Sequence, residues 1–297
     1  MNNLELISKI KLHLESNPID SITISCDNEL FPIKICEGKK ELHETRSLSK
    51  VIISLAIGKW VEENIDISLD TNVWPLIVRR QATQKAHYKT TIRDLLMQSA
   101  GYSNSTLLME GHTTAKKEEY LNLLMTLGQD YKPGTRFVYS NASYYLLSVL
   151  FQRVSSINIY EYIKQSIFDD LEIYDSEWEN WGEFCAGSTG LYLKPSDVHK
   201  IGLLILNNGV YKDKRVIKLS YINEMKKKQI TLDGYKSKNP LKPTGYGYGL
   251  WYVNPNVHYI SGANGQYIIV DEMKRIVITI MSTGEIYPML YQIHKWI

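Results

Sequence analysis

The chain has 297 residues and is close to neutral, with 34 Lys and Arg residues against 32 Asp and Glu residues. This balance gives no electrostatic basis for binding nucleic acid. The 44% apolar and 22% charged content is typical of a globular protein. No run approaches the roughly 18 apolar residues that span a bilayer, and the first residues lack the basic and apolar regions of a secretion signal.

The cysteine count supports the same class of protein. Cys26, Cys36 and Cys185 are an odd number and form no disulfide framework, although Cys26 and Cys36 can face each other across a hairpin. Three cysteines in a chain of this length are more typical of buried thiols in a reducing compartment. The composition therefore predicts a cytoplasmic protein that binds neither nucleic acid nor membrane, and it leaves the oligomeric state open.

The first residues predict a helix, a hairpin and then a buried helix. Apolar residues recur at helical spacing over 3–15. Ser21–Ser25 alternates as a strand does, and Leu30–Cys36 forms the return strand after an Asp27-Asn28 turn. The stretch Val51–Ile57 is too apolar for a surface helix, which predicts a helix buried in the core.

The middle of the chain is helical, and its last part is rich in strands. After a loop over 66–75, helices are expected at 90–101, 115–127, 142–154, 158–168 and 195–206, with a turn at 132–135. Short β-rich runs occupy 249–253, 257–261, 266–271 and 276–281, and 286–296 can form a closing helix. The pattern predicts an α+β fold, in which the N-terminal hairpin and the C-terminal strands form one antiparallel sheet. Residues 1–65 and 186–297 would form this α/β region, and 66–185 the inserted helical region.

The first candidate site is Ser47-Leu48-Ser49-Lys50 at the start of the buried helix. Positions i and i+3 share a helix face, so the Lys50 amine can reach the Ser47 hydroxyl and take its proton. The pattern alone is weak, because Ser8-Lys9-Ile10-Lys11 repeats it in an amphipathic segment. The alternative for Ser47 is an ordinary helix N-cap, with Lys50 in water. A buried helix that begins with Ser and Lys favours the catalytic interpretation.

Two further segments can complete a site. Tyr139-Ser140-Asn141 lies between a Pro-Gly turn and an apolar helix, and a Tyr whose pKa is lowered by a nearby ammonium can act as a general base. The same pattern recurs at Tyr221 and Tyr252, in a lysine-rich helix and a strand, where a structural role is expected.

The other segment is Tyr259-Ile260-Ser261-Gly262-Ala263-Asn264-Gly265-Gln266, a strand that ends in a turn of small residues. Its main-chain N–H can form an oxyanion hole with that of Ser47. A plain hairpin turn is the alternative for this segment.

In this order the three segments resemble the serine β-lactamase and penicillin-binding-protein superfamily, most closely its class C-like branch of esterases, D-peptidases and 6-aminohexanoate-dimer hydrolase-like proteins. The resemblance runs from about residue 43 to 283 and includes the connecting phrases 91–96, 132–137, 190–197 and 265–267. It implies an antiparallel sheet with helices packed on it and an all-helical part, with the site between them.

The resemblance also assigns roles to the residues. It implies Ser47 as the acylated nucleophile, Lys50 as its activator and Tyr139 as a proton shuttle. Asn141 would contact substrate or lysine, and the N–H groups of Ser47 and Ala263 would form the oxyanion hole. Acyl transfer followed by hydrolysis needs no metal or other cofactor. The substrate would be a small ester, amide or peptide.

One departure from the family pattern affects the expected substrate. Members that recognise penicillin carry Lys-Thr-Gly or His-Thr-Gly where this chain has Ile260-Ser261-Gly262. The cation that would meet a substrate carboxylate is therefore missing, unless His258 or an arginine replaces it. The sequence predicts a serine hydrolase for a small ester or amide. An acyltransferase, a β-lactamase or D-peptidase, and a non-catalytic binding protein stay open as alternatives.

Overall fold

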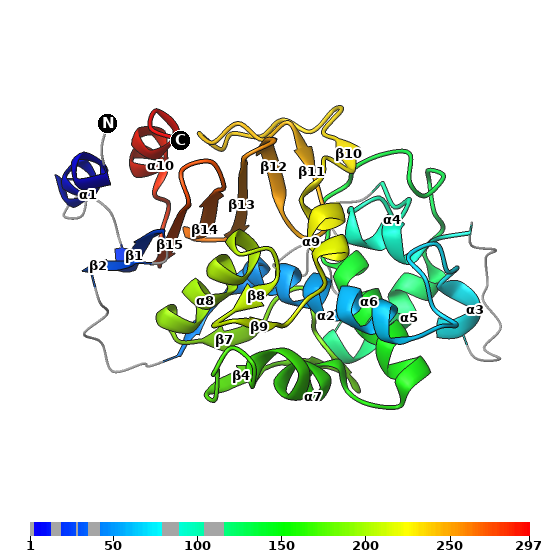
Figure 1. Ribbon diagram of the computed structural model, residues 1–297. Helices are drawn as coiled ribbons and strands as arrows, with labels where there is room; N and C mark the ends of the chain where they lie inside the picture. The colour runs from blue at the N-terminus through cyan, green and yellow to red at the C-terminus, as the bar shows by residue number, and fades with distance from the viewer. Residues whose placement is uncertain (1–2, 13–18, 28, 35–41, 79–88, 104–115) are drawn as a thin grey trace.

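The computed structural model describes residues 3–12, 19–27, 29–34, 42–78, 89–103 and 116–297 (Figure 1). Its centre is an eight-stranded antiparallel sheet in the order β10-β11-β12-β13-β14-β15-β1-β2. In that order the strands are Ile230–Thr231, Gly245–Tyr246, Trp251–Asn254, Val257–Gly262, Gln266–Asp271, Ile276–Ser282, Ile19–Cys26 and Glu29–Lys34. Because β1 pairs with β15, the predicted α+β sheet of N-terminal hairpin and C-terminal strands is confirmed.

Helices cover both faces of this sheet. On one face, α1 (Asn3–Leu12) packs against α10 (Tyr287–His294), beside both chain ends in Figure 1. On the other face, α8 (Pro195–Leu206) packs on β14 and β15, and α2 (Ser49–Glu63) belongs to the same apolar core. Every residue of β14 and β15 is buried, as expected for strands covered on both sides.

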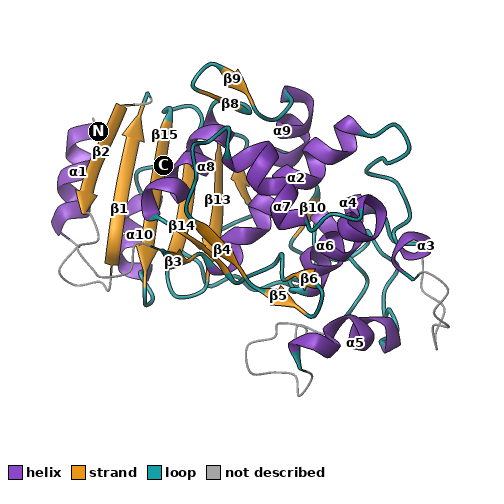
Figure 2. Cartoon of the chain, turned by 90° about the horizontal axis from the view of Figure 1, so that it is seen from below, coloured by secondary structure: helices purple, strands orange, loops and turns teal. Residues whose placement is uncertain are grey.

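The remaining helices lie mainly at one end of the molecule (Figure 2). They are α3 (Trp74–Ile77), α4 (Ile92–Leu96), α5 (Tyr120–Thr126), α6 (Ala142–Ser155), α7 (Ile159–Ile163) and α9 (Leu219–Lys226). Short strands form a three-stranded sheet of β3 (His43–Glu44), β7 (Leu191–Leu193) and β4 (Ser176–Trp178). Two small hairpins pair β5 (Asn180–Trp181) with β6 (Phe184–Cys185) and β8 (Val210–Tyr211) with β9 (Lys214–Arg215).

The predicted elements differ from the structure mainly at their ends. The helix at 195–206 has the predicted bounds, whereas α4 ends at Leu96 instead of 101, because Gln98 takes a left-handed conformation with φ of 59°. Helix α3 begins at Trp74 and so lies partly in the expected loop, and Pro75 in its first turn is a residue suited to that position. The two- and three-residue strands are too short to show an alternating pattern. The proposed boundaries at 65 and 186 stay a prediction.

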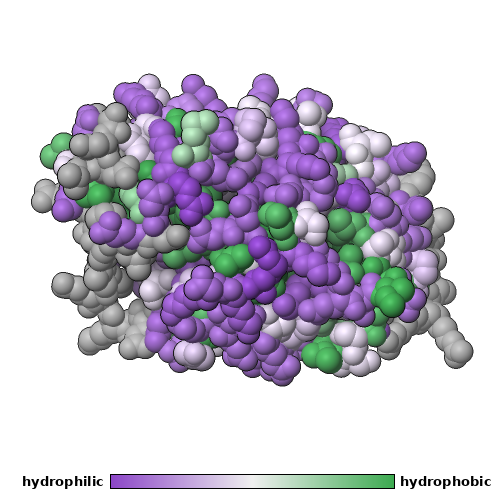
Figure 3. Space-filling view, in the orientation of Figure 1, coloured by the Kyte–Doolittle hydropathy of each residue, from purple (hydrophilic) through white to green (hydrophobic). Residues whose placement is uncertain are grey.

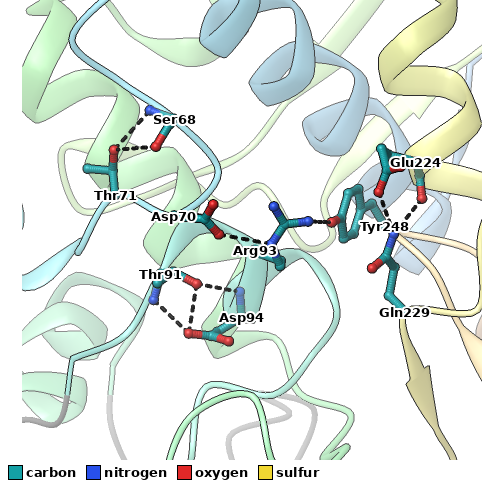
Figure 4. Close-up of polar contacts among 9 residues, drawn as sticks. All are labelled: Ser68, Asp70, Thr71, Thr91, Arg93, Asp94, Glu224, Gln229 and Tyr248. Atoms are coloured by element: carbon teal, nitrogen blue, oxygen red, sulfur yellow. Dashed lines mark hydrogen bonds and ion pairs between the residues drawn. The ribbon is translucent and has the colours of Figure 1, made fainter.

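Helix α4 connects the helical part to the region around the sheet (Figure 4). Thr91 and Asp94 form a capping box that fixes its first turn. Arg93 donates from Nε to Asp70 at 3.0 Å and from Nη1 to the Tyr248 hydroxyl at 2.5 Å. Tyr248 lies between β11 and β12, so this arginine links α4 to the turn that packs against α2.

The surface, the helix lengths and the cysteines relate to the predictions about membranes and disulfides. On the face shown in Figure 3, the described residues are mainly hydrophilic and the apolar ones lie in small groups. Within the described ranges, no helix combines the length and the apolar character needed to cross a membrane. Cys26 and Cys185 are buried free thiols, and Cys36 lies outside the described residues.

Candidate active site

Ser47 and Lys50 are in direct contact at the start of α2. Ser47 lies in a 3₁₀ turn, Arg46–Leu48, that leads into the helix, and Lys50 is in the first turn of α2. Lys50 Nζ donates a hydrogen bond to Ser47 Oγ at 2.8 Å. Ser8 and Lys11, which have the same spacing, are exposed on α1. Burial of the following helix therefore distinguishes the two copies of the pattern.

Lys50 is held by acceptors from three separate segments. Besides Ser47 Oγ, its Nζ donates to Asn141 Oδ1 at 2.9 Å and to the Ser188 carbonyl oxygen at 2.9 Å. The side chain is only 1% exposed. An ammonium has three donors, and these three acceptors match them. Ser188 could not be identified from the sequence, because any residue type can supply a backbone carbonyl.

The segment before Ser47 is fixed by backbone contacts. Both N and Oγ1 of Thr45 donate to the Leu191 carbonyl, at 2.8 and 2.9 Å. Arg46 has φ of 51°, which is uncommon for a residue with a side chain, and its Nε lies 3.0 Å from Glu44 Oε2. This strained residue directly precedes Ser47, so the anchored Thr45 and the helix α2 together determine where the hydroxyl points.

The Tyr139–Asn141 segment is held by a residue that the sequence did not single out. Gln98 is fully buried, and its backbone carbonyl accepts from Val138 N at 2.8 Å. Its side-chain Oε1 accepts from Ser140 N at 3.1 Å. One glutamine thus holds the backbone on both sides of Tyr139, just before α6 begins at Ala142.

Tyr139 contacts both members of the Ser47–Lys50 pair. Burial raises the pKa of Tyr139 above its usual value, and a hydrogen bond with Ser47 acts in the opposite direction. Lys50 Nζ lies over the Tyr139 ring, 5.0 Å from its centroid. Because the effect of burial is the larger one, the pKa of this phenol is raised, and the expectation that it is lowered is wrong. Near neutral pH Tyr139 is a neutral phenol that can donate a proton.

The third segment approaches Ser47 through a glycine. Strand β13 ends at Gly262, where an added Cβ would lie 2.7 Å from the Thr45 carbonyl oxygen and 2.9 Å from Arg46 Cβ. Only a residue without a side chain allows this distance. Ala263 follows, in a turn where Asn264 and Gly265 have φ of 66° and 87°. Ser261, Gly262 and Ala263 all line the same pocket as Ser47.

Neither Ile260 nor His258 faces this pocket. Ile260 is 1% exposed and packs in the core with α2 and α8. His258 is equally buried, and its Nε2 lies 3.3 Å from Glu272 Oε1. His258 therefore does not supply the missing cation. Within the described part of the chain, the cationic side chains that line the pocket are Arg46 and Lys238.

The pocket has a volume of about 390 Å³, and one wall is aromatic. The Trp251 ring stacks with Tyr139 at a centroid distance of 5.4 Å and with Tyr259 at 6.0 Å. Tyr221 and Tyr252 are absent from the lining. The lining residues that sequence reasoning did not single out are Arg46, Thr189, Tyr235, Ser237, Lys238, Asn239, Trp251, Glu285 and Tyr287. Among the described residues, no group of three or more His, Cys, Asp or Glu is placed to hold a metal ion.

Comparisons with known proteins agree with this architecture. A family model described as Beta-lactamase matches residues 38–294. EstCE1, a hydrolase with promiscuous acyltransferase activity, has a TM-score of 0.76 at 12% identity, covering 98% of this chain and 97% of that one. An octameric penicillin-binding protein homologue from Pyrococcus abyssi has a TM-score of 0.74 at 22% identity, with coverages of 96% and 74%.

A D-stereospecific amidohydrolase from a Streptomyces species has a TM-score of 0.70 at 13% identity, with coverages of 96% and 95%. No curated protein matches the chain. At these identities the structural likeness shows a β-lactamase/transpeptidase-like fold alone.

The close contact at Gly262 leads to a testable prediction. Gly262→Ala should force the end of β13 away from Thr45 and Arg46, because the new Cβ would overlap both. We expect the rate at which a fluorophosphonate labels Ser47 to fall about 10-fold or more, since a displacement of roughly 1 Å in an active site can cost on the order of 100-fold. Intact-mass spectrometry over time measures this rate, and a thermal melt checks folding. A folded variant that is labelled at the wild-type rate would contradict the proposed importance of this contact.

Proposed function

The chain belongs to the β-lactamase family, and we propose that it is a serine hydrolase that cleaves a small ester or amide through an acyl-Ser47 intermediate. The observation that carries this proposal is the contact of Lys50 Nζ with Ser47 Oγ, in a cluster where Asn141 and Ser188 are the other acceptors. A protein that only binds a ligand has no need of a buried lysine directed at a serine hydroxyl in a pocket.

The hydrogen bonds around Lys50 suit the activation of a nucleophile. In its neutral form the amine keeps two N–H groups, which Asn141 Oδ1 and the Ser188 carbonyl can accept. Its lone pair is then directed at Ser47 Oγ, 2.8 Å away. As Ser47 Oγ attacks the carbonyl carbon of the substrate, its proton passes to Lys50 Nζ.

Tyr139 supplies the other proton transfer. It is hydrogen-bonded to Ser47 and, because burial raises its pKa, carries the proton that a leaving alcohol or amine needs. The N–H groups of Ser47 and Ala263 would stabilise the oxyanion of the tetrahedral intermediate. Water then attacks the acyl-enzyme, Ser47 is released, and Lys50 and Tyr139 return to their starting protonation states.

A second candidate function is acyl transfer to an alcohol or amine in place of water. Acyl transfer would use the same acyl-enzyme. The similarity in fold to a hydrolase with promiscuous acyltransferase activity supports it as the second candidate. Product analysis in the presence of a primary alcohol separates the two functions. A transferase gives mainly the new ester, whereas a hydrolase gives mainly the free acid.

Replacement of Ser47 tests the nucleophile. Ser47→Ala should abolish turnover and covalent labelling, with a loss of several orders of magnitude in kcat, because the attacking atom is removed. Intact-mass spectrometry with a fluorophosphonate, together with ester hydrolysis, measures both effects. Ser8→Ala is the matched control, since Ser8 has the same sequence pattern but is exposed on α1. An adduct that forms on the Ser47→Ala protein, or labelling found at Ser8, ends the proposal.

Lys50 and Tyr139 should act as one proton-transfer unit. We expect Lys50→Ala and Tyr139→Phe each to lower kcat/KM strongly, and the double variant to be little worse than the poorer single one. Tyr221→Phe and Tyr252→Phe are the controls and should leave kcat/KM nearly unchanged, because neither residue lines the pocket. Losses that add in the double variant would show that the two residues act independently.

Substrate binding should not require a substrate carboxylate that is bound by the third segment. Ile260 and His258 are buried away from the pocket, so neither provides the charge-assisted hydrogen bond that contributes roughly 1.5–3 kcal/mol in binding. We expect kcat/KM for a chromogenic cephalosporin to be lower than for short-chain p-nitrophenyl esters. If the cephalosporin reacts faster than every ester, a β-lactamase or D-peptidase function replaces the proposed one.

A further inference from the structure

Part of the pocket lining comes from other elements than those that carry Ser47, Tyr139 and Ser261. Tyr235 and Asn239 come from the loop between β10 and β11, Tyr267 comes from β14, and Glu285 and Tyr287 lie at the start of α10. None of these residues belongs to the three segments identified from the sequence. Four of them, Tyr235, Tyr267, Glu285 and Tyr287, form what we call the tyrosine subsite.

The tyrosine subsite contains the carboxylate of the pocket. Among the described residues that line the pocket, Glu285 is the acidic one, and its side chain is exposed. No described Lys, Arg or His lies within ion-pair distance of it. The Tyr287 hydroxyl makes a side-chain hydrogen bond with Glu285. The charge of this carboxylate is thus available to a ligand.

The aromatic rings around Glu285 are partly open to the pocket. Tyr235 is 40% exposed and Tyr287 is 39% exposed, so both rings are accessible to a ligand. Tyr267 is only 5% exposed, and its hydroxyl accepts a hydrogen bond from Asn239 Nδ2 at 3.0 Å, so its ring is fixed in place. Tyr235 is held by packing on Phe137 and Trp251, with centroid distances of 5.3 and 5.5 Å.

A carboxylate among aromatic rings is a suitable environment for an organic cation. The negative faces of tyrosine rings attract an ammonium group, and a nearby carboxylate adds an opposite charge. Building on the serine hydrolase function proposed above, we propose that the tyrosine subsite binds an ammonium group of the substrate, so that the substrates are esters or amides carrying a cationic group several atoms from the carbonyl.

Two cations also line the pocket. Arg46 pairs with Glu44, with Nε 3.0 Å from Oε2, which offsets its charge. Lys238 is exposed in the loop next to Asn239, and a flexible exposed lysine can turn into water when a cationic ligand enters. Lys238 therefore weakens the preference for a cation without abolishing it, and its replacement should strengthen that preference.

Isosteric pairs of substrates test the subsite. For a cation in the alcohol part, acetylcholine is compared with 3,3-dimethylbutyl acetate. For a cation in the acyl part, the p-nitrophenyl ester of 4-(trimethylammonio)butanoate is compared with that of 5,5-dimethylhexanoate. We expect the cationic member of at least one pair to have a kcat/KM about 10-fold higher, the size expected from a cation–π contact with a nearby carboxylate.

Variants identify the residues responsible. Glu285→Gln should reduce the preference, measured as the ratio of kcat/KM for the cationic member to kcat/KM for the neutral member, to about 2-fold or less. Lys238→Met should increase the preference. The control is Glu177→Gln, an exposed glutamate on β4 outside the pocket, which should change nothing. Equal kcat/KM values within both wild-type pairs, or an unchanged preference in Glu285→Gln, overturn the assignment of the subsite.

A binding measurement separates this inference from the proposed function. Choline should slow the fluorophosphonate labelling of Ser47 more than 3,3-dimethylbutanol does, and Glu285→Gln should remove the difference. If neutral esters turn over and choline protects no better than the neutral alcohol, the subsite is wrong and the hydrolase stands. If neither ester turns over and Ser47 is not labelled, both are overturned.

Discussion

The burial of one lysine ammonium is the constraint on which the arrangement of the site depends. Lys50 is 1% exposed, and placing an ion in the interior costs several kcal/mol unless it is hydrogen-bonded. Its acceptors come from the turn before α2, from Asn141 before α6 and from the Ser188 carbonyl before β7. Three segments far apart in the sequence must therefore meet at one atom for the fold to tolerate this residue. In the proposed mechanism, the same contact activates Ser47.

These segments meet through close backbone contacts at glycines. A Cβ on Gly249 would lie 3.1 Å from the Lys50 carbonyl oxygen, and one on Gly187 would lie 2.8 Å from the Tyr144 carbonyl oxygen. Gly262 approaches Thr45 in the same way. Each glycine thus brings a different segment against α2, α6 or the turn that carries Ser47. The geometry around Lys50 depends on these backbone distances as much as on the side chains that bind it.

The sequence predicted those parts of the protein that local patterns determine. The apolar run after Ser47 predicted the buried helix, and the first and last strands predicted the sheet, because each pattern reflects burial of its own segment. The residue types at the start of α2 identified Ser47 and Lys50 as candidates, and those just before α6 identified Tyr139 and Asn141. Ser188 could not be predicted, because it contributes only a backbone carbonyl. Gln98 could not be predicted, because it binds the backbone of a segment, 138–140, that is distant in the sequence. The pKa of Tyr139 also depends on the burial of its ring and on its hydrogen bond with Ser47, which only the folded chain determines.

The residues around Lys50 and those of the proposed tyrosine subsite differ in how firmly they are held. Lys50, Asn141 and Gln98 are buried and bonded to the core, so a change there disturbs several segments at once. Tyr235 and Lys238 belong to an exposed loop, and Glu285 and Tyr287 lie at the start of a short helix. Substitutions in the tyrosine subsite can alter the charge and shape of the pocket, while the hydrogen bonds of Lys50 persist. A chain of this fold can therefore change its substrate without rebuilding its nucleophile.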